Sequence, residues 1–186
     1  QILSGIYPEW ERTKFLQLCE RFGLPLNKKI KTFSTGMKMK LSIIAALSHN
    51  ARLLVLDEAL NGIDPVARDG ILDIFMDYTR DEGHSILLSS HIVSDLEKIC
   101  DYVVFIQKGN VILSEEKDRL LEKYALLAME RAQYDAMPKT GVRRMLDAHG
   151  TVRVLMEREY VPHGMPLERL GLEDMMLMIG KGEEIR

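Results

Sequence analysis

The pattern of apolar and polar residues predicts helices and short strands through the first half of the chain. Apolar side chains recur every three or four residues, as on the buried face of a helix, in three segments. These segments are residues 8–22, 35–48 and 65–83. Two short and largely apolar runs, residues 53–56 and 85–90, lie close to them. Such runs are typical of strands buried on both faces of a parallel sheet, so we expect an α/β fold.

The second half of the chain has a different pattern. Residues 102–107 and 111–114 are β-prone and flank Lys108-Gly109-Asn110, a sequence typical of a hairpin turn. Beyond Tyr124 we expect a strand, a hairpin across His149-Gly150 and a helix. Their predicted ranges are 124–129 for the strand, 142–146 and 152–156 for the hairpin, and 172–179 for the helix. These elements would form a small α/β appendage.

Two acids follow the first apolar run directly. Asp57 and Glu58 lie where this strand is expected to end, and ligands of parallel sheets bind at that edge. Two carboxylates there suit phosphate chemistry, because one can hold Mg²⁺ while the other orients a water molecule. The same pair could also be a solvated acidic turn.

A turn of small polar residues precedes the second helix. In Ser34-Thr35-Gly36, either Ser34 or Thr35 is a plausible N-cap. Lys38 and Lys40 follow in the first turns, where cations oppose the helix dipole unless an anion such as a polyphosphate binds. Solvated lysines on an exposed face are the alternative.

Taken together, these motifs resemble the ATP-binding-cassette (ABC) ATPases, most closely the ATPase subunits of bacterial exporters. Four segments carry the resemblance, in the order and spacing of that family. They are the signature loop at Ser34-Thr35-Gly36-Met37-Lys38, the Walker B strand at residues 53–58, the D-loop at Asn61-Gly62-Ile63-Asp64 and the switch histidine at His91.

The resemblance implies a P-loop NTPase-like ABC ATPase core that works as a dimer, with ATP held between two subunits. In that family the acid at Asp57 binds Mg²⁺, the acid at Glu58 is the general base and the histidine at His91 contacts the γ-phosphate. The residues implied in nucleotide binding are Ser34, Thr35, Gly36, Met37, Asn61, Gly62 and Asp64. Asp64 is also expected to cap the helix that starts at Pro65, leaving one carboxylate oxygen free for the dimer interface.

The resemblance also divides the chain. It implies a helical subdomain with the signature loop in residues 1–50, a partial ATPase core in residues 51–120 and the α/β appendage in residues 121–186. A transmembrane permease subunit and a second ATPase subunit are the implied partners. The protein would then be cytoplasmic, peripheral on the inner face of the cell membrane.

Several positions depart from the family pattern. Phe33, Thr35 and Met37 replace the first, third and fifth residues of the usual Leu-Ser-Gly-Gly-Gln, and Ala59-Leu60 follows Glu58 where Pro-Thr is usual. The phosphate-binding pattern G-x-x-x-x-G-K followed by Ser or Thr does not occur in the sequence. We therefore expect the C-terminal part of a longer protein, lacking the Walker A half and inactive alone.

Composition narrows the function further. The hydrophobic content of 46% and the charged content of 28% are ordinary for a globular protein. A net charge of −3 argues against nucleic acid as a partner, and no apolar run approaches the ~20 residues that span a bilayer. Any contact with the membrane would come through a partner. Cys19 and Cys100 lie in helical patterns typical of reduced, core-facing thiols.

Two other functions remain open at this stage. One is a soluble ABC ATPase that acts on the ribosome or on DNA, although the sequence has neither long coiled-coil heptads nor a basic tail. The other is a non-catalytic interaction module.

Overall fold

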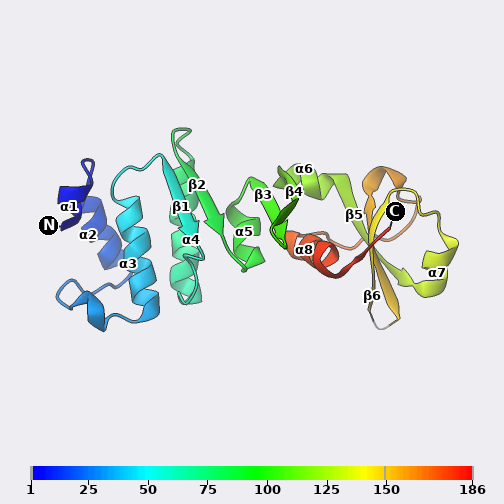
Figure 1. Ribbon diagram of the computed structural model, residues 1–186, viewed down its shortest axis with the longest axis horizontal. Helices are drawn as coiled ribbons and strands as arrows, with labels where there is room; N and C mark the ends of the chain where they lie inside the picture. The colour runs from blue at the N-terminus through cyan, green and yellow to red at the C-terminus, as the bar shows by residue number, and fades with distance from the viewer. Residues whose placement is uncertain (1, 149, 186) are drawn as a thin grey trace. The chain divides into compact units, whose positions relative to one another are not determined.

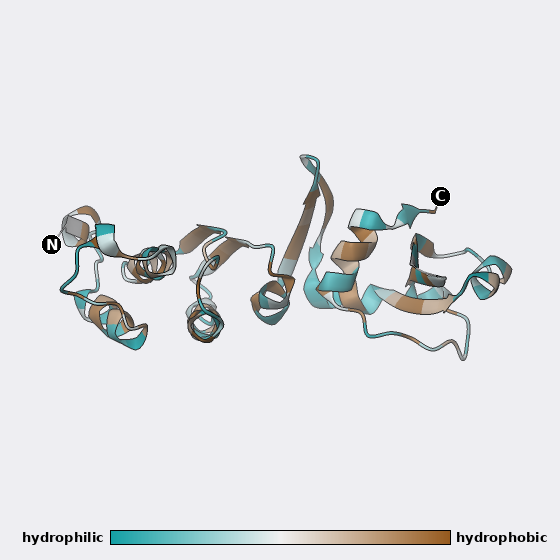
Figure 2. Cartoon of the chain, turned by 90° about the horizontal axis from the view of Figure 1, so that it is seen from below, coloured by the Kyte–Doolittle hydropathy of each residue, from teal (hydrophilic) through white to brown (hydrophobic). Residues whose placement is uncertain are grey.

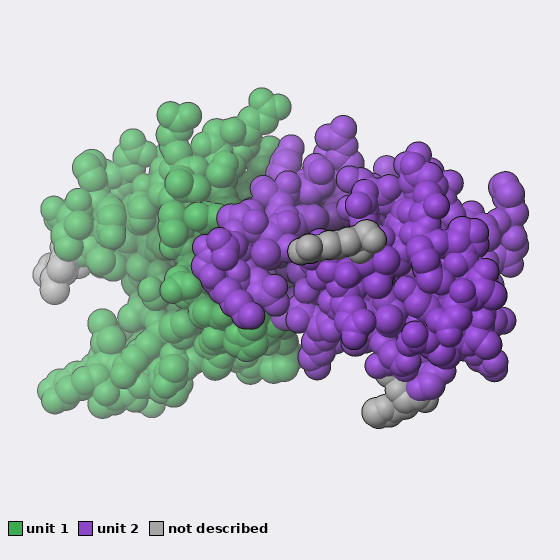
Figure 3. Space-filling model, turned by 45° about the vertical axis from the view of Figure 1, so that its right-hand side comes forward, with its two compact units in different colours: residues 1–95 green, residues 96–186 purple. Residues whose placement is uncertain are grey.

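The computed structural model describes residues 2–148 and 150–185. These residues form two compact units, which divide between Asp95 and Leu96 (Figure 3). His149, in the predicted hairpin turn, lies outside the described residues. The three-part division expected from the family stays a prediction, because it concerns the parts of a complete ATPase. No helix within the described residues is long and apolar enough to span a bilayer.

The first unit begins with helices. They are α1 (Ile2–Ile6), α2 (Arg12–Arg21), the 3-10 turn η1 (Ile30–Thr32) and α3 (Thr35–Leu47) (Figure 1). Helix α2 starts later than the predicted residue 8, and the chain turns away at Gly23, whose φ of +64° favours glycine. Apolar side chains from α2, α3 and the loop between them form one cluster: Cys19, Leu24, Phe33 and Ile44. This cluster places the start of α3.

Two parallel strands follow, and they position the acidic residues. Strands β1 (Leu53–Asp57) and β2 (Ser85–Ser89) pair in parallel, with Asp57 opposite Ser89. Helix α4 (Pro65–Thr79) makes the crossover and contacts β2. It ends at Thr79 rather than at the predicted residue 83. The parallel pair confirms the predicted parallel sheet of an α/β fold.

The expectation that both strands are buried on both faces was wrong for this chain. Leu54 and Leu56 point into the core, but Leu53, Val55 and Leu87 are 55%, 66% and 63% exposed. The physical reason is that this sheet has two strands among the described residues, and the buried side chains lie on one of its faces. Apolar composition predicted burial, but the number of layers that cover a sheet depends on the rest of the assembly.

Helix α5 (Val93–Ile99) links the two units in sequence, and a hairpin opens the second. Strands β3 (Tyr102–Gln107) and β4 (Asn110–Glu116) pair antiparallel, which confirms the predicted hairpin. Lys108 and Gly109, with φ of +51° and +77°, make a turn that matches the twist of the strands. Strand β3 is apolar over most of its length, and β4 is apolar at residues 111–113 (Figure 2).

The remainder of the second unit is an antiparallel sheet with short helices. Its strands lie in the order β5-β7-β6-β8. The strands are β5 (Tyr124–Glu130), β6 (Val142–Ala148), β7 (Thr151–Glu157) and β8 (Glu183–Glu184). The helical segments are α6 (Lys117–Lys123), α7 (Arg131–Ala136), η2 (Arg158–Tyr160) and α8 (Leu172–Lys181). The predicted strands and final helix are confirmed within one or two residues at most of their ends.

Methionines supply much of the buried core of the second unit. In α8, Met175 and Met178 are buried, whereas Met176 is half-exposed. Core packing rather than a contact surface therefore accounts for two of the three methionines of this helix. The thiols also follow the expected pattern: Cys19 and Cys100 are free, and burial raises the pKa of both.

The burial of two neighbouring residues on α4 predicts how much stability each contributes to the first unit. Phe75 on α4 is 1% exposed, so Phe75→Ala should lower the free energy of unfolding by about 3–5 kcal/mol through lost burial and a cavity. The neighbouring Met76 is 38% exposed, and Met76→Ala should cost about 1 kcal/mol or less. Urea denaturation of the two variants measures the difference. Equal losses would contradict the placement of α4.

Candidate functional site

The ends of the two parallel strands are tied together by one serine. The Ser89 hydroxyl donates a hydrogen bond to Asp57 Oδ1 at 2.5 Å and accepts one from the Glu58 backbone N–H at 2.9 Å. The same N–H lies 3.2 Å from the Ser89 carbonyl oxygen. Sequence analysis did not assign Ser89 a role. No local pattern in the sequence predicts this role, because the parallel register that places Ser89 opposite Asp57 arises only in the folded sheet.

Glu58 lies at the centre of the site. Its backbone has a φ of +48°, a left-handed conformation uncommon for a residue other than glycine. Its Oε2 accepts a hydrogen bond from Asn61 Nδ2 at 2.8 Å and lies 3.0 Å from His91 Nδ1. For this second contact to be a hydrogen bond, Nδ1 must carry the proton. Strained backbone of this kind is frequent at functional sites.

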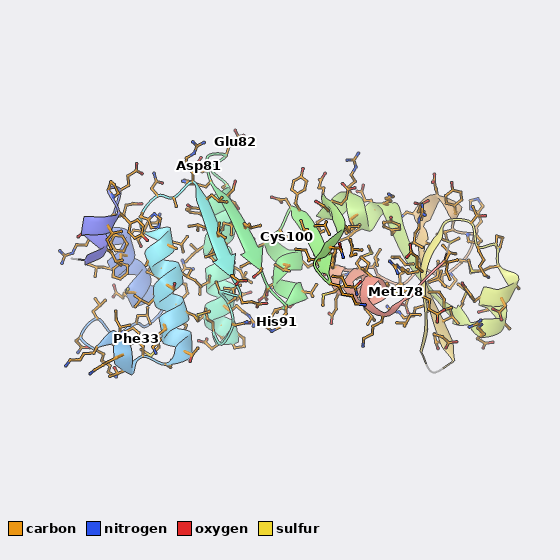
Figure 4. All side chains as sticks on the ribbon, in the orientation of Figure 1. Phe33, Asp81, Glu82, His91, Cys100 and Met178 are labelled. Atoms are coloured by element: carbon orange, nitrogen blue, oxygen red, sulfur yellow. The ribbon has the colours of Figure 1, made fainter. Side chains whose placement is uncertain are left out.

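His91 reaches the acid from the other strand. It lies where the chain leaves β2 (Figure 4), and its side chain is 66% exposed, while that of Glu58 is 42% exposed. The pair is therefore accessible from solvent. Two residues that are 33 positions apart meet because parallel strands end at the same edge of the sheet. The structure thus brings together three predicted site residues, Glu58, Asn61 and His91.

The signature turn caps helix α3. The Ser34 hydroxyl accepts a hydrogen bond from the Met37 backbone N–H at 3.2 Å, so of the two candidate caps the residue is Ser34. Thr35 is then the first helical residue. Phe33 is buried, and Met37 packs against the same apolar cluster, which gives these two departures from the family pattern a structural reason.

Asp64 caps the next helix, as predicted, but it has no free oxygen. Its Oδ1 accepts a hydrogen bond from the Ala67 backbone N–H at 2.9 Å, and its Oδ2 accepts one from Lys40 Nζ at 2.7 Å. The expectation of a free oxygen was wrong because a lysine from α3 reaches it. The hydrogen bond from Lys40, and then that from Ala67, lower the pKa of the Asp64 carboxyl.

The signature turn and the turn at residues 61–64 touch through two glycines. A Cβ added at Gly36 would lie 2.5 Å from the Gly62 carbonyl oxygen, closer than real Cβ atoms approach. Gly62 itself has a φ of +71°. Glycine at position 36 is therefore required by a close backbone approach. This contact places the signature turn against the turn at residues 61–64, which follows the two acids in sequence.

The arrangement offers a carboxylate with a hydroxyl partner, a second carboxylate held by an amide and an imidazole, and a capped helix N-terminus nearby. Asp57 provides carboxylate oxygens of the kind that Mg²⁺ binds, and the Ser89 hydroxyl orients them, so this pair fits that ion. Within residues 2–148 and 150–185, no group of three or more His, Cys, Asp and Glu side chains is placed to hold a metal.

Comparison with known proteins gives the family. Residues 8–61 match the family model described as ABC transporter. The uncharacterized ABC transporter ATP-binding protein YhcH of Bacillus subtilis is 30% identical over 202 residues, 99% of this chain and 65% of that protein. The lantibiotic transport ATP-binding protein SrtF of Streptococcus pyogenes is 39% identical over 105 residues, 55% of this chain and 45% of that protein.

A solved structure supports the same relationship. An ATP-binding subunit of an ABC transporter matches with a TM-score of 0.52 and 28% identity, over 67% of this chain and 50% of that one. This chain spans about half the length of the curated relatives it matches. The motifs, the crossover fold and these similarities agree, and the chain belongs to the ABC transporter ATPases.

Proposed function

We propose that this chain forms the hydrolytic part of an ABC transporter subunit that uses ATP to drive export. The observation that carries the proposal is the contact of Glu58 Oε2 with Asn61 and His91 at the shared edge of β1 and β2. An ATPase needs a proton acceptor held at a fixed position beside the attacking water. A solvated acidic turn would not need a strained backbone, an amide and an imidazole around one carboxylate.

In this proposal Glu58 is the general base. Among the described residues, Asn61 and His91 both contact Oε2 of its carboxylate, so Oε1 remains available to accept a proton from water. His91 and Asn61 fix the direction in which the carboxylate points. His91 is exposed enough to reach a phosphate group as well.

Asp57 is the residue that would hold Mg²⁺. The ion would neutralise charge on the transferred phosphoryl group. The chain's own contribution is orientation: the Ser89 hydroxyl holds Oδ1 of the carboxylate, and the backbone N–H of Glu58 holds Ser89. Outer partners of this kind commonly set the affinity of a metal site.

The remaining predicted residues would act on a second copy of the subunit. Ser34, Thr35, Gly36 and Met37 would contact the ATP held by the partner, since the start of α3 offers backbone N–H groups and a favourable dipole to phosphate. A phosphate-binding loop must then come from outside this sequence, which fits the length of the relatives, about twice the part matched here. A permease subunit would provide the contact with the inner face of the membrane.

Mutation of the two acids in the complete ATPase should have different effects. Glu58→Gln keeps the size of the side chain but removes the base, so ATP should still bind while hydrolysis falls about 10²–10⁴-fold. Asp57→Asn should weaken Mg²⁺-dependent nucleotide binding as well. Single-turnover hydrolysis measured beside nucleotide affinity tests both. Near-normal turnover in Glu58→Gln, with tight binding, would assign the proton to another group.

The 186-residue chain by itself should bind ATP only weakly. Its signature turn would recognise phosphate that another subunit holds, and its sequence contains no phosphate-binding loop. Isothermal titration calorimetry with Mg²⁺ and ATP should show little heat. Submicromolar binding would mean that the chain carries a nucleotide site of its own.

Ser89 should control the affinity for the metal. Ser89→Ala removes the hydrogen bond to Asp57, and we expect the half-saturating Mg²⁺ concentration for nucleotide binding to rise about tenfold. Ser89→Thr keeps the hydroxyl and should stay near the wild type. Ser85→Ala, at the exposed start of the same strand, is the matched control. An unchanged Mg²⁺ requirement in Ser89→Ala would refute this role.

A further inference from the structure

Lys40 is the half-buried cation of the signature helix. It lies in the second turn of α3, its side chain is 14% exposed, and its Nζ lies 2.7 Å from Asp64 Oδ2. Lys38, two positions earlier, is exposed. The two lysines therefore differ: one is solvated, and the other spans 24 residues of sequence to reach the carboxylate that closes the turn at residues 61–64.

The same turn contacts α3 at a second point. Gly36, in the first turn of the helix, lies so close to the Gly62 carbonyl that no side chain fits between them. One contact is a backbone approach near the start of the turn, and the other is an ion pair at its end. Two contacts at separate points restrict rotation of the turn as well as its displacement. Residues 61–64 are therefore held against α3 as a unit.

This turn also carries the amide that holds the proposed base. Asn61 Nδ2 donates to Glu58 Oε2 at 2.8 Å, and the Asn61 backbone N–H donates to the Glu58 carbonyl oxygen at 3.1 Å. A shift of the turn would move this amide and release the carboxylate from one of its two contacts. The position of Glu58 thus depends on how firmly the turn is held against α3.

We propose that Lys40 is a positioning residue for Glu58, acting through Asp64 and the turn at residues 61–64. This inference rests on the proposed function and deepens it. The start of α3 would contact ATP held by the partner subunit, while Glu58 would act on the ATP of its own subunit. The Lys40–Asp64 ion pair couples these two places, so that displacement of α3 is passed to the base.

If Lys40 only stabilised the fold, its loss would lower stability rather than the rate of hydrolysis. Lys40 is 14% exposed, but its partner Asp64 is more than half exposed, so solvent weakens the ion pair and its loss should cost little stability. The cap of α4 does not depend on Lys40, because the Ala67 N–H binds the other carboxylate oxygen. Loss of the ion pair should therefore leave the fold intact. Small displacements of a catalytic group, in contrast, reduce rates strongly.

The test uses Lys40→Met and Asp64→Asn in the complete ATPase, with Lys31→Met, at an exposed lysine outside the signature loop, as the control. Asparagine keeps the helix cap but loses the ion pair. We expect the single-turnover rate constant to fall about tenfold in both variants, with a melting temperature close to the wild type in both and an ATP affinity close to the wild type in Lys40→Met. Lys40→Arg should restore most of the rate. The double variant should lose no more than either single one, because the two residues act as a pair.

A second measurement separates this inference from the proposed function. In the 186-residue chain, NMR should show the Asn61 side-chain amide signals shifted by Lys40→Met and unmoved by Lys31→Met. If the complete wild-type protein hydrolyses no ATP, the proposed function fails while this shift still supports the coupling. Unmoved Asn61 signals would overturn the inference. So would wild-type turnover in Lys40→Met, or a lower rate matched by an equal loss of ATP affinity.

Discussion

The parallel register of β1 and β2 is the constraint on which the site depends. It places Asp57 opposite Ser89 and lets one hydroxyl join the carboxylate of the first strand to the backbone of the residue after it. A shift by one residue would turn every side chain of the strand to the other face. Glu58 and His91 meet because they follow the ends of their strands at the same edge of the sheet. Such a shift would therefore separate them.

Two helix caps extend this arrangement away from the sheet. Ser34 begins α3 and Asp64 begins α4, and each does so by satisfying a backbone N–H that would otherwise lack a partner. Asp64 uses its second oxygen for Lys40, so one side chain starts a helix and joins it to another. The caps thus place the two turns that surround the acids, and they do so with groups needed for helix formation in any case.

The second unit is built on a different principle. Its four-stranded sheet is antiparallel, and apolar residues from β5, β6, β7 and α7 form a buried cluster. Helix α8 packs against β6. Arg153 forms two ion pairs there. Its guanidinium lies 2.9 Å from Glu168 Oε2 and 2.8 Å from Asp174 Oδ1. These contacts account for a stable fold.

The sequence by itself determined the elements and the family. Alternation of apolar runs, caps and turn residues predicted the strands around Asp57 and His91, because these signals act over a few residues. It could not decide which atoms meet. The role of Ser89, the pairing of Lys40 with Asp64 and the exposure of Val55 depend on register, crossover and the layers that cover a sheet. Contacts between residues 24 to 33 positions apart are products of tertiary packing, which local pattern does not encode.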